Sequence, residues 1–88
     1  MKWERFSALE EKEVINICDG KRLGAVCDLE FDPVTGKVCT LIVPEEGGRF
    51  CLFGKERAYF VPWCCIRRIG DDIILVEAAE EEILRENG

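Results

Sequence analysis

Residues 61–77, which read VPWCCIRRIGDDIILVE, carry the strongest indication of the fold. Two apolar runs, residues 66–69 and 73–76, flank a Gly-Asp-Asp sequence at residues 70–72. This order is typical of two strands joined by a tight turn. Trp63 directly follows a proline at the end of a preceding strand, and we expect it to anchor the core.

Working outward, the rest of the chain alternates short apolar runs with turn sequences. Further strand-like runs occupy residues 14–17, 23–31, 38–43, 50–53 and 58–61. Several short strands with regular turn signals predict a small all-β barrel or sandwich.

Residues 32–37, Asp-Pro-Val-Thr-Gly-Lys, suit a four-residue hairpin loop. Pro33 fixes one backbone angle and Gly36 accepts a left-handed conformation, so Asp32 is expected opposite Lys37. Counting outward from this loop predicts that Phe31 faces Val38, Leu29 faces Thr40, Cys27 faces Ile42, Glu30 faces Cys39 and Asp28 faces Leu41.

The strand at residues 38–43 is apolar on both of its faces. Such a strand needs a cover on its outward face, which a helix or a second subunit could supply. In a chain of 88 residues little material is left for that cover, so we expect a homodimer. The predicted contact residues are Cys39, Leu41 and Val43.

The two ends of the chain are short additions to this domain. Ser7 followed by Glu10 matches a capping box and predicts a helical turn at residues 8–12. Residues 78–88 are acidic and rich in helix formers, which predicts a short C-terminal helix or tail. We therefore divide the chain into an extension, residues 1–5, a domain, residues 6–77, and this tail.

The charge and apolar content of the chain limit the kinds of partner that it can bind. The net charge is −6, and residues 77–88 hold five glutamates against one arginine. An acidic chain with few clustered cations is poorly suited to nucleic acid. No apolar run is long enough to cross a membrane, and the charged N-terminus lacks the apolar region of a signal peptide. We expect a cytoplasmic protein that binds no membrane.

The order of several motifs resembles the PRC-barrel domain, in particular its small stand-alone sporulation-associated members. The matching residues are Ser7 to Leu9, Val14-Ile15-Asn16, Gly20, Leu23-Gly24, Asp28, Asp32 with Thr35-Gly36, Pro62-Trp63, Ile66, Ile69 and Gly70-Asp71-Asp72. The resemblance implies a closed six-stranded β-barrel that serves as an assembly module. The chain departs from the family pattern at Glu11, where relatives often have glycine, and at Cys64-Cys65, where many have polar residues.

Six cysteines and no histidine are present. No Cys-x-x-Cys pair occurs, so a zinc site is poorly supported. We expect free thiols, with Cys18, Cys27 and Cys51 used as small buried hydrophobes. Cys64 and Cys65 are the candidate ligands for a thiolate-bound metal, or a candidate redox pair, if another strand or subunit contributes.

No set of residues resembles a catalytic centre, and no cofactor motif is present. The favoured hypothesis is a non-enzymatic scaffold or adaptor that binds itself and an unknown protein partner. The first alternative is a metal-binding or redox module built on Cys64 and Cys65. The second, which rests on kinship with a ribosome-maturation factor, is association with ribosomes or RNA.

Overall fold

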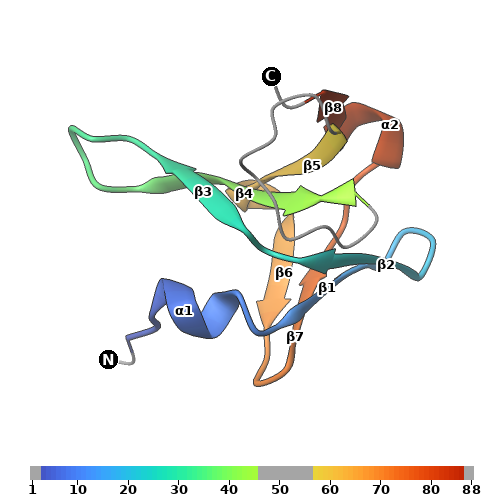
Figure 1. Cartoon of the computed structure of the whole chain (residues 1–88), viewed down its shortest axis with the longest axis horizontal. Coiled ribbons are helices and arrows are strands. Elements are labelled where there is room, and N and C mark those ends of the chain that lie inside the picture. The colour runs from blue at the N-terminus through green and yellow to red at the C-terminus, as the bar shows by residue number, and fades with distance from the viewer. Residues whose placement is uncertain (1–2, 46–56, 87–88) are drawn as a thin grey trace.

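The computed structural model describes residues 3–45 and 57–86 (Figure 1). The expected strand at residues 50–53 and Cys51 therefore lie outside the described residues. The elements are α1 (Phe6–Leu9), β1 (Glu13–Asn16), β2 (Lys21–Ala25), β3 (Asp28–Phe31), β4 (Val38–Pro44), β5 (Arg57–Pro62), the 3-10 helix η2 (Trp63–Cys65), β6 (Ile66–Ile69), β7 (Ile73–Val76), α2 (Glu80–Ile83) and β8 (Leu84–Glu86).

The strands form two four-stranded sheets, in the orders β2-β1-β7-β6 and β3-β4-β5-β8. The hairpin predicted at residues 66–76 is confirmed as β6 and β7, whose turn is closed by the Gly70 N–H donating to the Ile73 carbonyl at 2.8 Å. In the first sheet β1 runs parallel to β7, a pairing that the sequence patterns did not predict.

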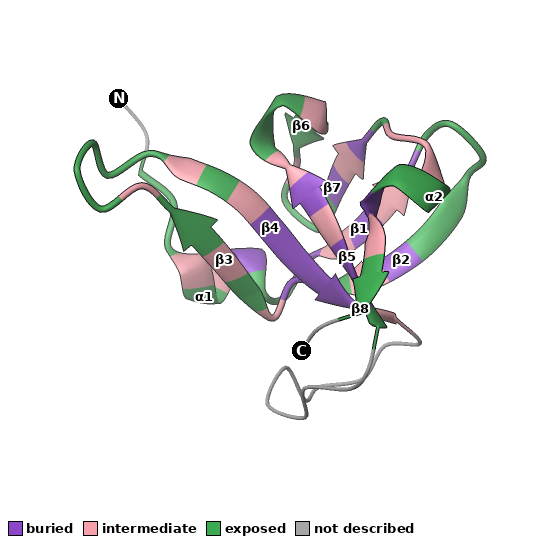
Figure 2. Ribbon diagram, turned by 90° about the horizontal axis from the view of Figure 1, so that it is seen from above, coloured by how far each residue is buried: buried purple, intermediate pink, exposed green. Residues whose placement is uncertain are grey.

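One core lies between the two sheets. Its largest fully buried side chains include Tyr59, Leu41, Ile74 and Val14. Figure 2 shows that the buried residues of β4 gather in the half of the strand farther from the hairpin loop. Apolar side chains from both sheets therefore meet in one cluster, as expected for a domain of this size.

The mostly β fold with a short helix near each end is confirmed, but a closed ring of six strands is not detected. The expected strand at residues 23–31 is broken into β2 and β3 because Val26 turns into the core, where it is 2% exposed. At this break the chain passes from the first sheet to the second. Among the described residues no ladder joins an edge of one sheet to an edge of the other.

The hairpin of β3 and β4 confirms the loop at residues 32–37. The Asp32 N–H donates to the Lys37 carbonyl at 2.8 Å, and Gly36 has a φ of +79°. Phe31 pairs with Val38 as predicted.

Beyond that pair the predicted register is wrong by one residue. Leu29 pairs with Leu41 and Glu30 pairs with Thr40, and the register shifts between Glu30 and Phe31. Such a shift marks a β-bulge, which leaves one residue of β4 without a partner. Cys39 is that residue.

Both ends of the chain differ from the capping and helix patterns. Arg5 occupies the N-cap of α1 without a side-chain cap bond, so Ser7 lies inside the helix and the predicted capping box is wrong. The predicted C-terminal helix is a single turn, α2, and the chain then continues as strand β8 against β5. No helix in the described part of the chain is long and apolar enough to cross a membrane.

Candidate functional site

Cys64 and Cys65, the candidate metal ligands, lie in η2, the single 3-10 turn between β5 and β6. Cys64 is exposed, whereas Cys65 is half-buried and packs against the core. Their backbone carbonyls are both used inside the chain. The Arg67 side chain donates to the Cys64 carbonyl at 2.8 Å, and the Glu77 N–H donates to the Cys65 carbonyl at 2.9 Å.

The surroundings of Cys65 oppose thiolate chemistry. Burial raises the pKa of the Cys65 thiol, and the neighbouring Cys64 raises it further. A raised pKa leaves less of the thiolate form, which is the form that binds metals and exchanges disulfides. In residues 3–45 and 57–86, no group of three or more His, Cys, Asp or Glu side chains is arranged to hold a metal ion.

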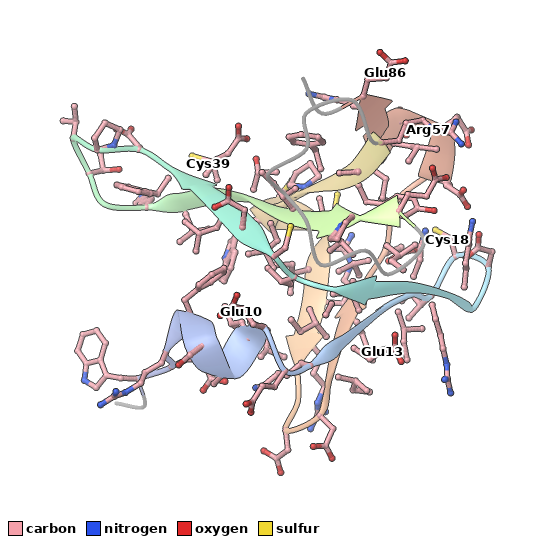
Figure 3. The ribbon with its side chains drawn as sticks, viewed as in Figure 1. Glu10, Glu13, Cys18, Cys39, Arg57 and Glu86 are labelled. Atoms are coloured by element: carbon pink, nitrogen blue, oxygen red, sulfur yellow. The ribbon has the colours of Figure 1, made fainter. Side chains whose placement is uncertain are left out.

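The other cysteines also differ from the expectation of buried thiols. Cys18 is exposed, because it lies in the turn after β1, where its N–H donates to the Asn16 side chain at 3.2 Å. Cys27 is half-buried and disulfide-bonded, so the expectation of a free thiol is wrong there. Cys18 and Cys39 lie far apart in Figure 3, at the β1–β2 turn and on the hairpin.

The predicted interface residues separate into two classes. Leu41 and Val43 are 1% and 0% exposed and belong to the core, which corrects their assignment to a subunit contact. The physical reason is that both faces of this half of β4 are covered within the chain. Only Cys39, the bulge residue, is exposed, and its Sγ lies 3.7 Å from the Lys37 carbonyl.

Two of the seven large exposed apolar side chains in the described residues lie on the outer part of the hairpin, residues 31–38, which we call the hairpin arm. It extends away from the body of the molecule (Figure 1). Phe31 is 57% exposed and Val34 is 91% exposed. Trp63, expected in the core, is 41% exposed on η2, a turn that contacts β4. Large exposed apolar side chains are candidates for contact with another protein.

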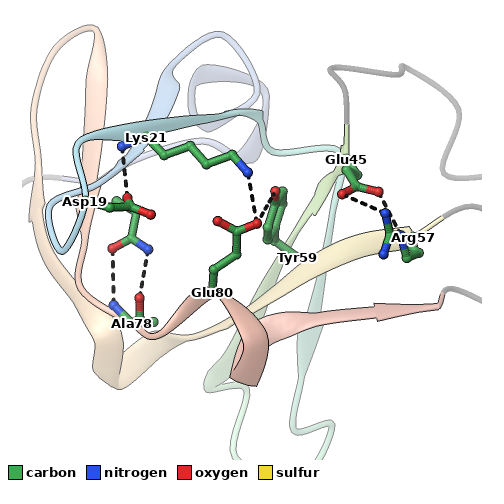
Figure 4. A network of polar contacts seen from close by, with 8 residues as sticks. Asp19, Lys21, Glu45, Arg57, Tyr59, Ala78 and Glu80 are labelled. Atoms are coloured by element: carbon green, nitrogen blue, oxygen red, sulfur yellow. Dashed lines mark hydrogen bonds and ion pairs between the residues drawn. The ribbon is translucent and has the colours of Figure 1, made fainter.

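A polar cluster that sequence reasoning missed joins the two sheets. Lys21 on β2 donates to Glu80 on α2 at 2.9 Å, and the Tyr59 hydroxyl on β5 donates to the same carboxylate oxygen at 3.4 Å (Figure 4). The Lys21 ammonium also lies 5.8 Å from the centre of the Tyr59 ring. The bond to Glu80, followed by Tyr59, raises the pKa of Lys21.

No local sequence signal connects these three residues, because Lys21 and Glu80 are separated by most of the chain. The cluster fixes α2 over the junction of β2 and β5. Its three polar groups bond to one another across separate elements, so we assign it a structural role.

Asn16 forms a second link to the same C-terminal segment. It is 0% exposed, and its amide donates to the Ala78 carbonyl at 2.7 Å while its Oδ1 accepts from the Ala78 N–H at 3.3 Å. Figure 4 shows the two bonds side by side at Ala78. A buried side chain with all its polar atoms bonded is a fold determinant.

Two shallow grooves flank the polar cluster. One, of about 460 Å³, is lined by Cys18, Asp19, Glu80, Glu81 and Leu84 with two alanines. The other, of about 450 Å³, is lined by Glu13 of β1, residues 21–24 of β2, Glu45 just after β4, and Tyr59. Among the described residues no buried side-chain polar atom lacks a partner, so neither groove presents a group that awaits a ligand.

Five of the nine basic side chains in the described residues form ion pairs with carboxylates. The ion pairs are Lys12–Glu4, Lys21–Glu80, Arg22–Glu13, Arg57–Glu45 and Arg67–Glu77. Cations already paired within the chain are poorly placed to neutralise phosphates. This arrangement gives no support to the RNA-associated alternative.

With this geometry in view, comparison with known proteins decides the family. The sequence pattern of the PRC-barrel domain matches residues 1–83. The chain belongs to the PRC-barrel family. The match extends beyond the predicted domain, residues 6–77, at both ends and stops one residue before β8.

Individual PRC-barrel relatives support this membership. The chain is 38% identical over 75 residues to the Bacillus subtilis protein YlmC, named a probable sporulation protein, covering 85% of this chain and 93% of the relative. It is 34% identical over 79 residues to the uncharacterized Bacillus subtilis protein YmxH, covering 88% and 92%. An uncharacterized Clostridium acetobutylicum protein is 38% identical over 73 residues, covering 81% and 80%.

Proposed function

We propose that the protein is a non-enzymatic scaffold that acts in the cytoplasm by assembling with other proteins, and that it does so as a homodimer. The observation behind this proposal is the hairpin arm, where the domain itself leaves the side chains of Phe31 and Val34 largely uncovered. Phe31 is more than half exposed on an arm that extends away from the core. A contact with a second copy would remove this apolar surface from water.

The arrangement of the remaining residues supports assembly rather than chemistry. The candidate thiols lie in a turn with a raised Cys65 pKa, and about half of the described carboxylates pair with basic side chains or cap turns. A small domain that gains stability from association fits this pattern. We extend the context of YlmC, a probable sporulation protein by name, to this chain as part of the proposal.

The test is sedimentation equilibrium of the whole chain and of two substitutions. Phe31→Asp places a charge in the proposed contact and should weaken dimerisation by at least about tenfold, as loss of a central aromatic contact does. Ile17→Asp, on the β1–β2 turn at the opposite end of the molecule, is the matched control and should leave it unchanged. A monomeric wild type, or equal dimerisation of wild type and Phe31→Asp, would overturn the proposal.

A further inference from the structure

Residues 78–86 form a segment that we call the C-terminal strap. It leaves the first sheet after β7 and ends as an edge strand of the second sheet. Ile83 anchors it in the core with 3% exposure, and Glu80 reaches Lys21 and Tyr59. The strap therefore passes from one sheet to the other beside Lys21 of β2 and Tyr59 of β5, which Glu80 contacts (Figure 4).

The strap covers an edge that is suited to receive a strand. β5 contains Ala58, Tyr59 and Val61, none of them more than 2% exposed, so it is built as an interior strand. On one side it pairs with β4 over residues 58–62. On the other side its only partner among the described residues is β8. Without β8 the edge would present unpaired backbone donors and acceptors.

The structure also shows which sequence fits this edge. Leu84, Arg85 and Glu86 pair with Tyr59, Ala58 and Arg57. The Arg85 guanidinium lies 5.7 Å from the centre of the Phe60 ring. Figure 3 shows Arg57 and Glu86 close together at this end of the molecule. Among the described residues, the segment that fits the open edge of β5 is therefore the strap of this chain itself.

Within the strap, the connection that leads into α2 is short and extended. Asn16 holds Ala78 to β1, and Ala79, with φ −71° and ψ +126°, is the single residue between that anchor and α2. A terminal element can be exchanged between copies at such a hinge, because the element makes the same contacts in a partner. The family match stops at Ile83, so the covering strand lies outside the matched domain.

We propose that two copies of this chain exchange C-terminal straps, so that β8 of each copy pairs with β5 of the other. The inference rests on the self-association in the proposed function and assigns it a second, strand-mediated contact. Every contact of α2 and β8 seen within one chain would be made again between chains.

The test is a disulfide trap in a mixture of two variants. One chain carries Arg57→Cys and the other carries Glu86→Cys, two positions that are paired and exposed. The exposed native cysteines Cys18, Cys39 and Cys64 are replaced by serine in both chains. Exchange of straps predicts a covalent heterodimer as the main oxidised product, with peptide mapping locating the bond between positions 57 and 86.

The matched control mixes Glu86→Cys with Lys37→Cys, an exposed position on the hairpin arm, and should give no specific heterodimer. If the first pair of variants fails to fold, the test is repeated with the next pair of facing residues, Ala58→Cys in one chain and Arg85→Cys in the other. A dimer in sedimentation that gives no 57–86 bond in the mixture, together with an internal bond in a chain carrying both substitutions, would overturn strap exchange and leave the proposed function standing. A monomer under all conditions would overturn both.

Discussion

Asn16 is the residue on which the C-terminal segment depends most. It is fully buried, and its amide group satisfies the Ala78 carbonyl and N–H as well as the Cys18 N–H. Backbone groups left unpaired in a protein interior lose their bonds to water without replacement. One side chain therefore holds β1, the following turn and the start of the strap in a fixed relation.

Asn16→Leu tests this role. The leucine leaves several buried backbone groups without partners, so we expect a loss of about 2–4 kcal/mol in the free energy of unfolding. Urea denaturation followed by circular dichroism measures it. Glu30→Gln, at an exposed position of β3, is the control and should change stability by less than about 0.5 kcal/mol. Equal stability of the two variants would show that the Asn16 bonds contribute nothing.

Cys64 and Cys65 should differ in reactivity although they are adjacent. Burial raises the Cys65 pKa above its usual 9.0, so Cys65 carries less thiolate than an exposed thiol at any pH near neutrality. Alkylation with iodoacetamide from pH 7 to pH 10, mapped by mass spectrometry, should modify Cys64 first. The Cys65 rate should still be rising at the highest pH. In urea the two cysteines should be alkylated at similar rates. Faster labelling of Cys65 than of Cys64 in the native state would contradict the structure.

The same raised pKa of Cys65 makes the stability of the protein depend on pH. The unfolded chain loses the thiol proton near pH 9.0, whereas the folded chain retains it to higher pH. Stability from this residue is therefore complete below pH 9.0 and falls as the pH rises above it.

Residue environments were the hardest property to predict from the sequence. Leu41 and Val43 were expected on a surface, yet both belong to the core. Trp63 was expected in the core, yet the 3-10 turn after Pro62 leaves it 41% exposed. Alternation along a strand identifies two faces, but which face is covered depends on segments far away in the sequence.

At the scale of elements, the β3–β4 hairpin depends on its turn. Gly36 has a φ of +79°, and its N–H donates to the Asp32 carbonyl at 2.7 Å. Residues with a Cβ pay a conformational penalty in this region. The turn sequence therefore fixes where the two strands reverse direction.

Gly36→Ala should destabilise the protein by about 1–2 kcal/mol, because alanine is strained at this backbone angle. Gly70→Ala is a matched control on the other hairpin. Gly70 has no positive φ, and a Cβ there would meet the Ile73 carbonyl oxygen at 3.4 Å, an ordinary contact. Urea denaturation of both variants makes the comparison, and an equal or larger loss at Gly70 would contradict the assigned turn.

Turn chemistry explains which elements could be predicted. The loops at residues 32–37 and 70–72 were located correctly because proline, glycine and aspartate set their geometry locally. The bulge at Cys39 carries no such signal, so the register beyond Phe31 and Val38 was predicted one residue out. The parallel pairing of β1 with β7 joins distant segments and has no local signal either.

At the scale of the whole molecule, side chains join two sheets that backbone ladders leave separate among the described residues. Lys21, Tyr59 and Glu80 come from β2, β5 and α2 and meet at one carboxylate. The family and the mostly β fold could be recognised from motif order, whereas this cluster could not, because it depends on the final positions of three separate elements. We propose a second copy of this chain as the partner because this arrangement leaves apolar side chains of the hairpin arm exposed.

The most direct test of homodimerisation is a native mass spectrum of the whole chain, purified without oxygen or added reductant. We expect a dimer without bound metal. A spectrum containing only the monomer would contradict the scaffold, because no self-association would remain to be explained. Extra mass that matches one zinc, iron or metal cluster per chain would also contradict the scaffold proposal. It would favour the metal-binding alternative, with Cys64 and Cys65 as the candidate ligands.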